Sequence, residues 1–284
     1  MEPLIAIRGL KKSFRVRGRR VAALQGIDVT VRAGEVFGML GPNGSGKSTA
    51  LRLLMGLTRA DAGTCMLFGA PAVGRAHLRR VGYLPERLSF FEHSTGAENL
   101  RLLARLGGLS TPETVDAVEQ TAALTGIADY ANRPVRTYSK GMRQRLGWAQ
   151  ALLHDPELLI FDEPTTGLDP LAKEAFHGLV GEWKAAGKTV VLCTHELDEA
   201  ERLCGRVTIL FEGRALAEGG PRGPGGADGS GEAVFRFRGL GPAESERLVR
   251  WLAGEGIEWE RMATGGLRAS VLEKLRWARR GGDE

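Results

Sequence analysis

The sequence predicts a globular α/β fold, and three observations carry that prediction. First, 43% of the 284 residues are hydrophobic and 26% are charged, which is too apolar for a disordered chain. Second, two short apolar runs, at residues 158–161 and 189–193, are typical of parallel strands that are buried on both faces. Third, a glycine-rich loop at residues 41–46 stands between a strand-like run and a helical one.

The opening of the chain, residues 3–40, alternates between apolar and polar residues in the manner of β-strands. Turn signals at Gly18 and Gly34 separate these strand-like runs. We therefore expect antiparallel strands joined by hairpins over this whole segment. A further hairpin is expected at residues 207–217, around Glu212 and Gly213.

Helices are expected at residues 47–57, directly after the glycine-rich loop, and over residues 96–130, where leucine, valine and alanine recur at helical spacing. Pro112 suits the first turn of the second helix in that segment. Either Ser110 or Thr111 is then its N-cap.

The plainest domain boundary is the segment 219–231, in which seven of 13 residues are glycine and two are proline, a composition typical of a flexible linker. It divides a main domain, residues 1–218, from a small α+β appendage at residues 232–284.

Composition excludes several classes of protein. The first residues lack the pattern of a secretory signal, and no apolar run approaches the roughly 18 residues of a membrane helix. The three cysteines form no CxxC pair, which argues against a zinc site and fits a reducing compartment.

The net charge is +5, with basic clusters at residues 15–20 and 276–280. Such clusters are solvated surface, or contact acidic lipid head groups or nucleic acid, and both readings stay open.

The glycine-rich loop satisfies the pattern GxxxxGK[ST], and it has the strand-to-helix context which that pattern requires. Glycines let backbone N–H groups turn inward around phosphate oxygens, and the following helix points its positive end at them. Lys47 would reach the β- and γ-phosphates, and the Ser48 hydroxyl would ligate Mg²⁺. The predicted nucleotide-binding residues of the loop are Gly41, Pro42, Asn43, Gly44, Ser45, Gly46, Lys47, Ser48 and Thr49.

A second element is the apolar run 158–161, which ends in Asp162 and Glu163. At the carboxyl edge of a parallel sheet, Asp162 would hold Mg²⁺ and Glu163 would polarise the attacking water. Alone, such a pair is usually a solvated strand end. The phosphate loop about 115 residues earlier favours the catalytic interpretation.

Residues 138–145, Tyr-Ser-Lys-Gly-Met-Arg-Gln-Arg, stand about 23 residues before Asp162 and resemble the LSGGQ-like signature of ATP-binding-cassette (ABC) transporters. Over residues 3–218 the chain resembles the nucleotide-binding subunits of that family. The resemblance implies a P-loop NTPase cassette with a RecA-like core, an antiparallel β subdomain and a helical subdomain at about residues 96–137. It also implies an ATPase whose substrate is ATP with Mg²⁺.

The resemblance further implies roles for individual residues. Phe14 would lie under the adenine, Glu86 would occupy the Q-loop position near the metal, and His195 would be the switch histidine. Asp169 would belong to the D-loop, although it can equally cap a helix that begins at Pro170. The signature residues, which would contact the nucleotide of a second subunit, are Ser139, Lys140, Gly141 and Met142.

Two positions depart from the usual family pattern: Glu86 replaces a glutamine, and Lys140 replaces a glycine. Both variants resemble ABC-2-type exporter ATPases. Residues 83–91 and 137–153 look most like the ATPase of the exporter that supports copper-site maturation of nitrous oxide reductase. The same segments also occur in ABC-2-type ATPases of drug, polysaccharide or gliding systems.

The resemblance implies two partners: a second cassette, expected to form a homodimer, and a separate membrane-spanning permease that places the chain at the cytoplasmic face of the cell membrane. No nucleic acid is expected. The alternative is a soluble ABC ATPase acting on nucleic acid or ribosomes, and the basic cluster 276–280 is its one positive sign. A nucleotide kinase is disfavoured by the signature and by His195.

Overall fold

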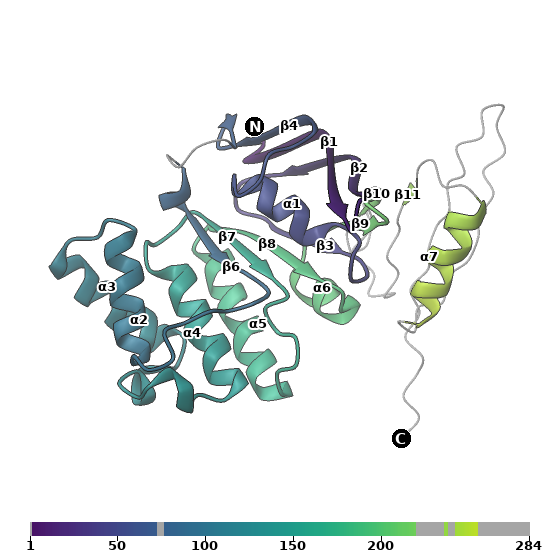
Figure 1. The fold of residues 1–284 in the computed structure, drawn as a ribbon. Coiled ribbons are helices and arrows are strands. Elements are labelled where there is room, and N and C mark those ends of the chain that lie inside the picture. The colour runs from purple at the N-terminus through teal and green to yellow at the C-terminus, as the bar shows by residue number, and fades with distance from the viewer. Residues whose placement is uncertain (1, 73–76, 220–235, 238–241, 255–284) are drawn as a thin grey trace, which may run out of the picture. The chain divides into compact units, whose positions relative to one another are not determined.

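The computed structural model describes residues 2–72, 77–219, 236–237 and 242–254. The predicted linker from residue 220 on, and residues 232–235, 238–241 and 255–284 of the predicted appendage, lie outside these residues. The chain forms two compact units (Figure 1). Unit 1 contains Met1–Ala72 and Thr194–Glu284, and unit 2 contains Val73–Cys193.

An antiparallel sheet with strand order β2-β1-β4-β5 belongs to unit 1. Strand β1 alternates between buried and exposed residues near its start, with Ile5 and Ile7 facing the core, as expected for a sheet with one solvated face. The predicted antiparallel pairing of β1 with β2 is confirmed. The strands are β1 (Ile5–Val16), β2 (Arg19–Val31), β4 (Ala62–Leu67) and β5 (Ala70–Pro71).

Strand β3 (Val36–Leu40) corrects the prediction for the opening segment, because it does not form a hairpin with β2. It runs parallel to β9 (Arg206–Phe211), with Phe37 opposite Arg206. All five β3 residues are buried, which suits a parallel strand covered on both faces. The predicted hairpin at 207–217 is confirmed, since β9 and β10 (Arg214–Gly219) are antiparallel. Within unit 1 the order is β11-β10-β9-β3, where β11 is Arg236–Phe237.

The helices of unit 1 are α1 (Lys47–Leu54), α6 (Leu197–Leu203) and α7 (Pro242–Gly254). Helix α1 packs against β2 and β4, and it ends three residues earlier than predicted. Gly56 has φ +67° just beyond that end, the left-handed conformation that stops many helices. Helix α7 contains residues 244–252 of the predicted α+β appendage.

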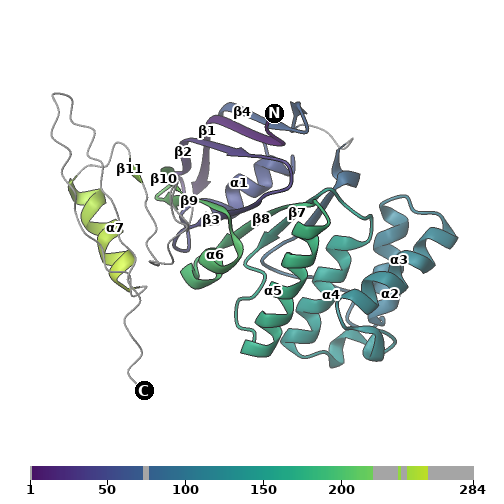
Figure 2. The ribbon, with the colours of Figure 1, turned by 180° about the vertical axis from the view of Figure 1, so that it is seen from behind.

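Unit 2 contains parallel strands in the order β8-β7-β6, namely β8 (Thr189–Thr194, whose last residue is assigned to unit 1), β7 (Leu158–Asp162) and β6 (Val81–Leu84). All residues of β7 and β8 are buried, which confirms the sequence prediction. Helices α4 (Lys140–Leu152) and α5 (Pro170–Ala185) lie side by side (Figures 1 and 2). Trp183 of α5 stacks on Phe161 of β7 with ring centroids 5.3 Å apart, which fixes the helix against the strand.

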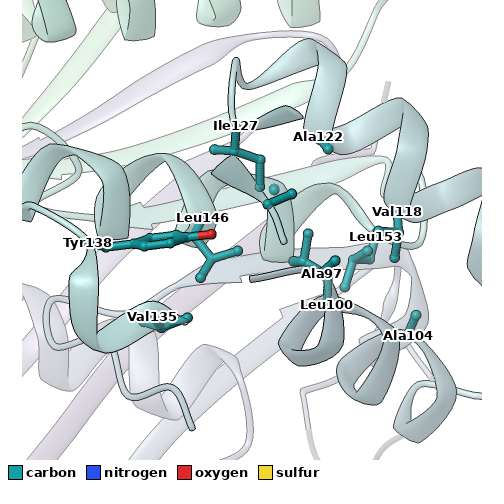
Figure 3. Close-up of a cluster of buried hydrophobic side chains, with 12 residues drawn as sticks. Ala97, Leu100, Ala104, Val118, Ala122, Ile127, Val135, Tyr138, Leu146 and Leu153 are labelled. Carbon is teal, nitrogen blue, oxygen red and sulfur yellow. The ribbon is translucent and has the colours of Figure 1, made fainter. Parts of the chain in front are cut away.

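The helical part of unit 2 adds α2 (Gly96–Leu106) and α3 (Thr111–Leu124). Each begins with a reciprocal capping box, Thr95 with Glu98 and Ser110 with Glu113, so Ser110 is the predicted cap that the structure uses. The apolar faces of α2, α3 and α4 meet in a buried cluster that includes Leu100 (Figure 3). The remaining cluster residues are Ala97, Ala104, Val118, Ala122, Ile127, Ala131, Val135, Tyr138, Leu146, Ala149 and Leu153.

Candidate active site

The glycine-rich loop lies between β3 and α1 in unit 1, as predicted. Two of its glycines are required by their surroundings. A Cβ on Gly41 would collide with the carbonyl oxygen of Leu210. A Cβ on Gly46, which has φ +111°, would lie 2.7 Å from the carbonyl oxygen of Ala23. No other residue fits at these two points without moving the neighbouring strands.

The polar groups of the loop fit a phosphate chain. Ser45 is buried, and its Oγ has no hydrogen-bond partner among the residues that the structure describes. The Nζ of buried Lys47 donates to the carbonyl oxygens of Gly41 at 2.6 Å and Pro42 at 3.4 Å, so the ammonium is held over the loop. Within the described chain no side chain caps the N-terminus of α1 at Gly46. The first backbone N–H groups of α1 therefore have the arrangement that is found at helix N-termini that bind anions.

The turn between β9 and β10 is hydrogen-bonded to the glycine-rich loop. The N–H of Gly213 donates to the carbonyl oxygen of Ser45 at 2.9 Å. The turn is itself tied to β2, because Gln25 donates to the Gly213 carbonyl oxygen through its N–H and to that of Glu212 through Nε2, both at 2.7 Å. Sequence reasoning identified this turn only as a hairpin, since nothing local indicates that it contacts a loop so far away along the chain.

Phe14, the residue that the resemblance expects under adenine, lies near the end of β1 and is 37% exposed. The ammonium of Lys12 lies 5.3 Å from the centre of the ring. The Asp61 carboxylate is close by. The backbone N–H of Ser13 is the main reason that the pKa of Asp61 is lowered, and the Lys12 side chain lowers it further against the opposing effect of burial.

His195 follows β8 directly, on a turn in which the N–H of Glu196 donates to Thr194 Oγ1 at 3.0 Å. The carbonyl oxygen of Thr194 accepts from the N–H of Gly41 at 3.3 Å. The turn that carries His195 therefore lies beside the first residue of the phosphate loop, within the same unit.

Strand β7 of unit 2 ends at Asp162, and Glu163 follows it directly. Asp162 is 2% exposed, the last residue of the strand. Glu163 has φ +54°, a left-handed conformation that costs a non-glycine residue about 1–2 kcal/mol. Its N–H donates to the carbonyl oxygen of Cys193 at 2.9 Å, which holds the strained turn in place. Strain of this kind is concentrated at functional sites, where the surrounding structure maintains it.

The Glu163 carboxylate has a specific orientation. Its Oε2 accepts a hydrogen bond from Thr166 Oγ1 at 3.0 Å, from a residue three positions further along. Sequence reasoning did not single out Thr166. The signal was available, because a hydroxyl residue three positions after a turn residue is well placed to bond back to it.

Asp169 is the N-cap of α5, where its Oδ1 accepts from the N–H of Ala172 at 2.8 Å and Pro170 occupies the first helical position. The capping role is therefore confirmed. Its D-loop role stays a prediction.

The signature residues begin helix α4. Ser139 is its N-cap and accepts from the N–H of Met142 at 3.2 Å. The ammonium of Lys140 lies against Gly167, close enough that a Cβ on that glycine would collide with it. Gln144 Nε2 donates to the carbonyl oxygen of Pro164 at 2.7 Å. The signature helix is thus bonded to the loop that follows Glu163, a contact that sequence reasoning missed.

Glu86 is exposed and follows the end of β6 by two residues, the position at which the Q-loop was expected. The predicted metal donors Ser48, Glu86 and Asp162 offer hydroxyl and carboxylate oxygens, which fit a hard cation such as Mg²⁺. None of the helices within the described residues combines the length and the hydropathy that a membrane span requires.

The fold and the loop define a P-loop nucleotide-binding protein with an ABC cassette fold. The family model of ABC transporters matches residues 24–166, half of the chain, and the chain belongs to this family. It is therefore an ATP-binding cassette ATPase.

Curated relatives share about two fifths of the aligned residues. An uncharacterized ABC transporter ATP-binding protein of Nostoc sp. is 41% identical over 215 residues, which cover 74% of this chain and 64% of that protein. The Nod factor export ATP-binding protein I of Rhizobium sp. is 42% identical over 219 residues, which cover 76% of this chain and 71% of that protein. The chain thus matches somewhat under two thirds of the first relative and somewhat over two thirds of the second.

Solved structures show the same fold. An ATP-binding subunit of an ABC transporter is 32% identical with a TM-score of 0.68, covering 76% of this chain and 90% of that one. The dimeric bacterial cassette MJ0796 is 25% identical with a TM-score of 0.71, covering 77% of this chain and 99% of that one. The protein cbiO1 of Clostridium perfringens, part of the ABC transporter complex cbiONQ, is 25% identical with a TM-score of 0.66, covering 78% and 90%.

Proposed function

We propose that this chain is the ATP-hydrolysing subunit of an ABC-2-type exporter, and that it acts on a separate membrane-spanning permease at the cytoplasmic face of the membrane. The assignment of ATP hydrolysis rests on Glu163, which directly follows the buried Asp162. Its backbone is strained, and its carboxylate is oriented by Thr166. A binding protein without turnover has no need to maintain such a turn.

The nucleotide would run from the phosphate loop to Phe14. Backbone N–H groups of residues 41–49, the Ser45 hydroxyl and the Lys47 ammonium would bind the phosphates, and the Phe14 ring would stack on adenine. Ser48 and Asp162 would hold Mg²⁺, with Glu86 near it. When bound, this ion neutralises charge that develops on the β- and γ-phosphate oxygens.

Hydrolysis would follow from the oriented carboxylate. The oxygen of the attacking water bonds to the γ-phosphorus while Glu163 accepts a proton from that water. At the same time, the bond from the γ-phosphorus to the β–γ bridging oxygen breaks. The products are ADP and phosphate. The imidazole of His195 would hold the γ-phosphate and the water in line, from the turn beside Gly41.

A second copy of the chain would complete the site. In this arrangement Ser139, Lys140, Gly141 and Met142, at the start of α4, face the γ-phosphate that the partner cassette binds. The dimeric structure of the similar cassette MJ0796 supports this, and one chain carries both a phosphate loop and a signature, so a homodimer is sufficient. We expect no nucleic acid partner. The name of cbiO1, part of the cbiONQ complex, supports pairing with other subunits.

The exporter assignment rests on relatives named Nod factor export ATP-binding protein I, which are 39–43% identical to this chain. They favour a Nod-factor-like cargo. A second candidate, the exporter for copper-site maturation of nitrous oxide reductase, is favoured by the stretches at residues 83–91 and 137–153.

Affinity purification of the tagged chain from detergent-solubilised native membranes tests the proposal. We expect a stoichiometric multi-spanning protein by mass spectrometry, and its identity distinguishes the two cargo systems. Recovery of the chain with RNA or ribosomes, and without such a protein, would favour the alternative function instead.

A further inference from the structure

The adenine end of the site contains an arrangement that none of the roles above explains. Strand β1 pairs with β4 as far as Lys11, opposite Ala62, and the N–H of Asp61 donates to the Lys11 carbonyl oxygen at 2.8 Å. Strand β1 then continues to Val16 without β4 beside it. The Asp61 carboxylate accepts the next available N–H, that of Ser13, at 2.8 Å. The Asp61 carboxylate thus accepts the hydrogen bond that a carbonyl of β4 would otherwise accept, and it extends the pairing of β1 beyond the end of β4.

The same carboxylate collects positive charge. Asp61 Oδ1 lies 3.3 Å from Lys12 Nζ, and Oδ2 lies 3.5 Å from the Arg20 guanidinium. Lys12 also donates to the carbonyl oxygen of Arg59 at 2.6 Å. Arg20 stands directly opposite Arg15 on the neighbouring strand, a pairing of like charges that destabilises a hairpin. The Asp61 carboxylate offsets that repulsion.

These contacts converge on Phe14. Lys12, with a side chain that is 14% exposed, places its ammonium 5.3 Å from the ring centre. A shift in strand register falls between Lys12 and Ser13, immediately before Phe14, and irregularities of this kind redirect side chains next to active sites. A cation over one face of an aromatic ring attracts its electron density, which leaves the other face better suited to stack on an electron-rich purine.

We infer that Asp61 and Lys12 are positioning residues that hold the Phe14 ring as the platform for the nucleobase and so set the affinity for ATP. The inference rests on the proposed role of Phe14. Because the phosphates are bound by the loop at residues 41–49, Asp61 and Lys12 act on the base alone and leave the chemical step unchanged.

Substitutions Asp61→Asn and Lys12→Met in the full chain test this inference. Asparagine keeps the shape of the side chain but loses its charge, and methionine keeps the packing stem but loses the cation. We expect each to raise the KM for Mg-ATP about two- to five-fold, the change that corresponds to one exposed cation–π contact, with kcat unchanged. The inhibition constant of inorganic tripolyphosphate, which has no base, should not change. Asp61→Glu, which keeps the charge, should recover part of the affinity.

Asp116→Asn is the matched control, because Asp116 is exposed on α3. This substitution should leave the KM for Mg-ATP, kcat and the inhibition constant of tripolyphosphate unchanged. An increase of the tripolyphosphate constant in parallel with the KM would overturn the inference, since it would indicate general damage to the site.

The variant Phe14→Ala separates the two proposals. If Phe14→Ala raises the KM for ATP and the Asp61 and Lys12 variants do not, only the positioning role fails. If Phe14→Ala has no effect either, the assignment of adenine to Phe14 fails with it.

Discussion

At the scale of single residues, the catalytic proposal depends on how Glu163 is held. A left-handed backbone turns the chain sharply at the end of β7, so that Glu163 departs from the strand direction that Asp162 still follows. The N–H bond to Cys193 and the hydroxyl of Thr166 then fix the backbone and the carboxylate respectively. Asp162 and Glu163 are adjacent in sequence, yet the turn between them gives them different roles.

Glu163→Gln should nearly abolish ATP hydrolysis and leave ATP binding intact. The amide keeps the size of the side chain but accepts no proton from water, and loss of a general base typically lowers the rate about 10²- to 10⁴-fold. Phosphate release measures the turnover, and size-exclusion chromatography with Mg-ATP measures the ATP-bound dimer, which should accumulate.

Glu182→Gln is the control for this variant, because Glu182 lies exposed on α5 and should retain full turnover. Wild-type phosphate release by Glu163→Gln would remove the base assignment.

The residue scale also shows where sequence reasoning succeeds. The phosphate loop is a local pattern, so its glycines, Ser45 and Lys47 could be identified from nine consecutive positions. Asp61 and Gly213 could not, because their contacts join segments that lie 48 and 168 residues apart, as Ser13 to Asp61 and Ser45 to Gly213. No spacing rule connects such residues before the strands are paired.

At the scale of secondary-structure elements, the apolar faces of α2, α3 and α4 determine how the helical part of unit 2 is held together (Figure 3). Tyr138, which immediately precedes the signature, packs in this cluster and donates from its hydroxyl to the carbonyl oxygen of Tyr130 at 2.7 Å. The start of α4 is therefore anchored by packing as well as by its Ser139 cap.

Leu100→Ala should lower the free energy of unfolding by about 2–5 kcal/mol, because it leaves a cavity among side chains that are completely buried. Leu106→Ala on the same helix is the matched control. Leu106 is 74% exposed, and its loss should cost no more than about 0.5 kcal/mol. Urea unfolding followed by circular dichroism measures both. Equal midpoints for the two variants would show that the cluster does not stabilise this unit.

Element type was easier to predict than element partners. The apolar run of β3 was recognised as a strand, but its partner β9 begins far along the chain, and a parallel pairing leaves no turn between the two strands for sequence reasoning to find. Hairpins such as β9–β10 could be predicted because the turn residues Glu212 and Gly213 lie between the paired strands.

At the scale of the whole molecule, the proposed mechanism requires that two chains share each site. A closed two-fold dimer presents the same surface on both copies, so each phosphate loop would face the signature of the other chain. Gly141 has the space that a test of this arrangement needs, since a Cβ there meets no atom closer than 4.0 Å. An aspartate at this position should therefore fold normally while it repels the partner's γ-phosphate.

A mixture of Lys47→Ala and Gly141→Asp chains should recover ATPase activity that neither variant has alone. In the mixed dimer one site combines both defects, and the other combines an intact phosphate loop with an intact signature. Equal amounts form mixed dimers in about half of the population, so phosphate release should reach about a quarter of the wild-type rate. Mixing a chain that carries both substitutions with either single variant is the control, because none of the dimers that form has an intact site and no activity should return. If the two single variants remain inactive when mixed, the signature does not act on the partner's nucleotide, and each chain would have to hydrolyse ATP with its own signature.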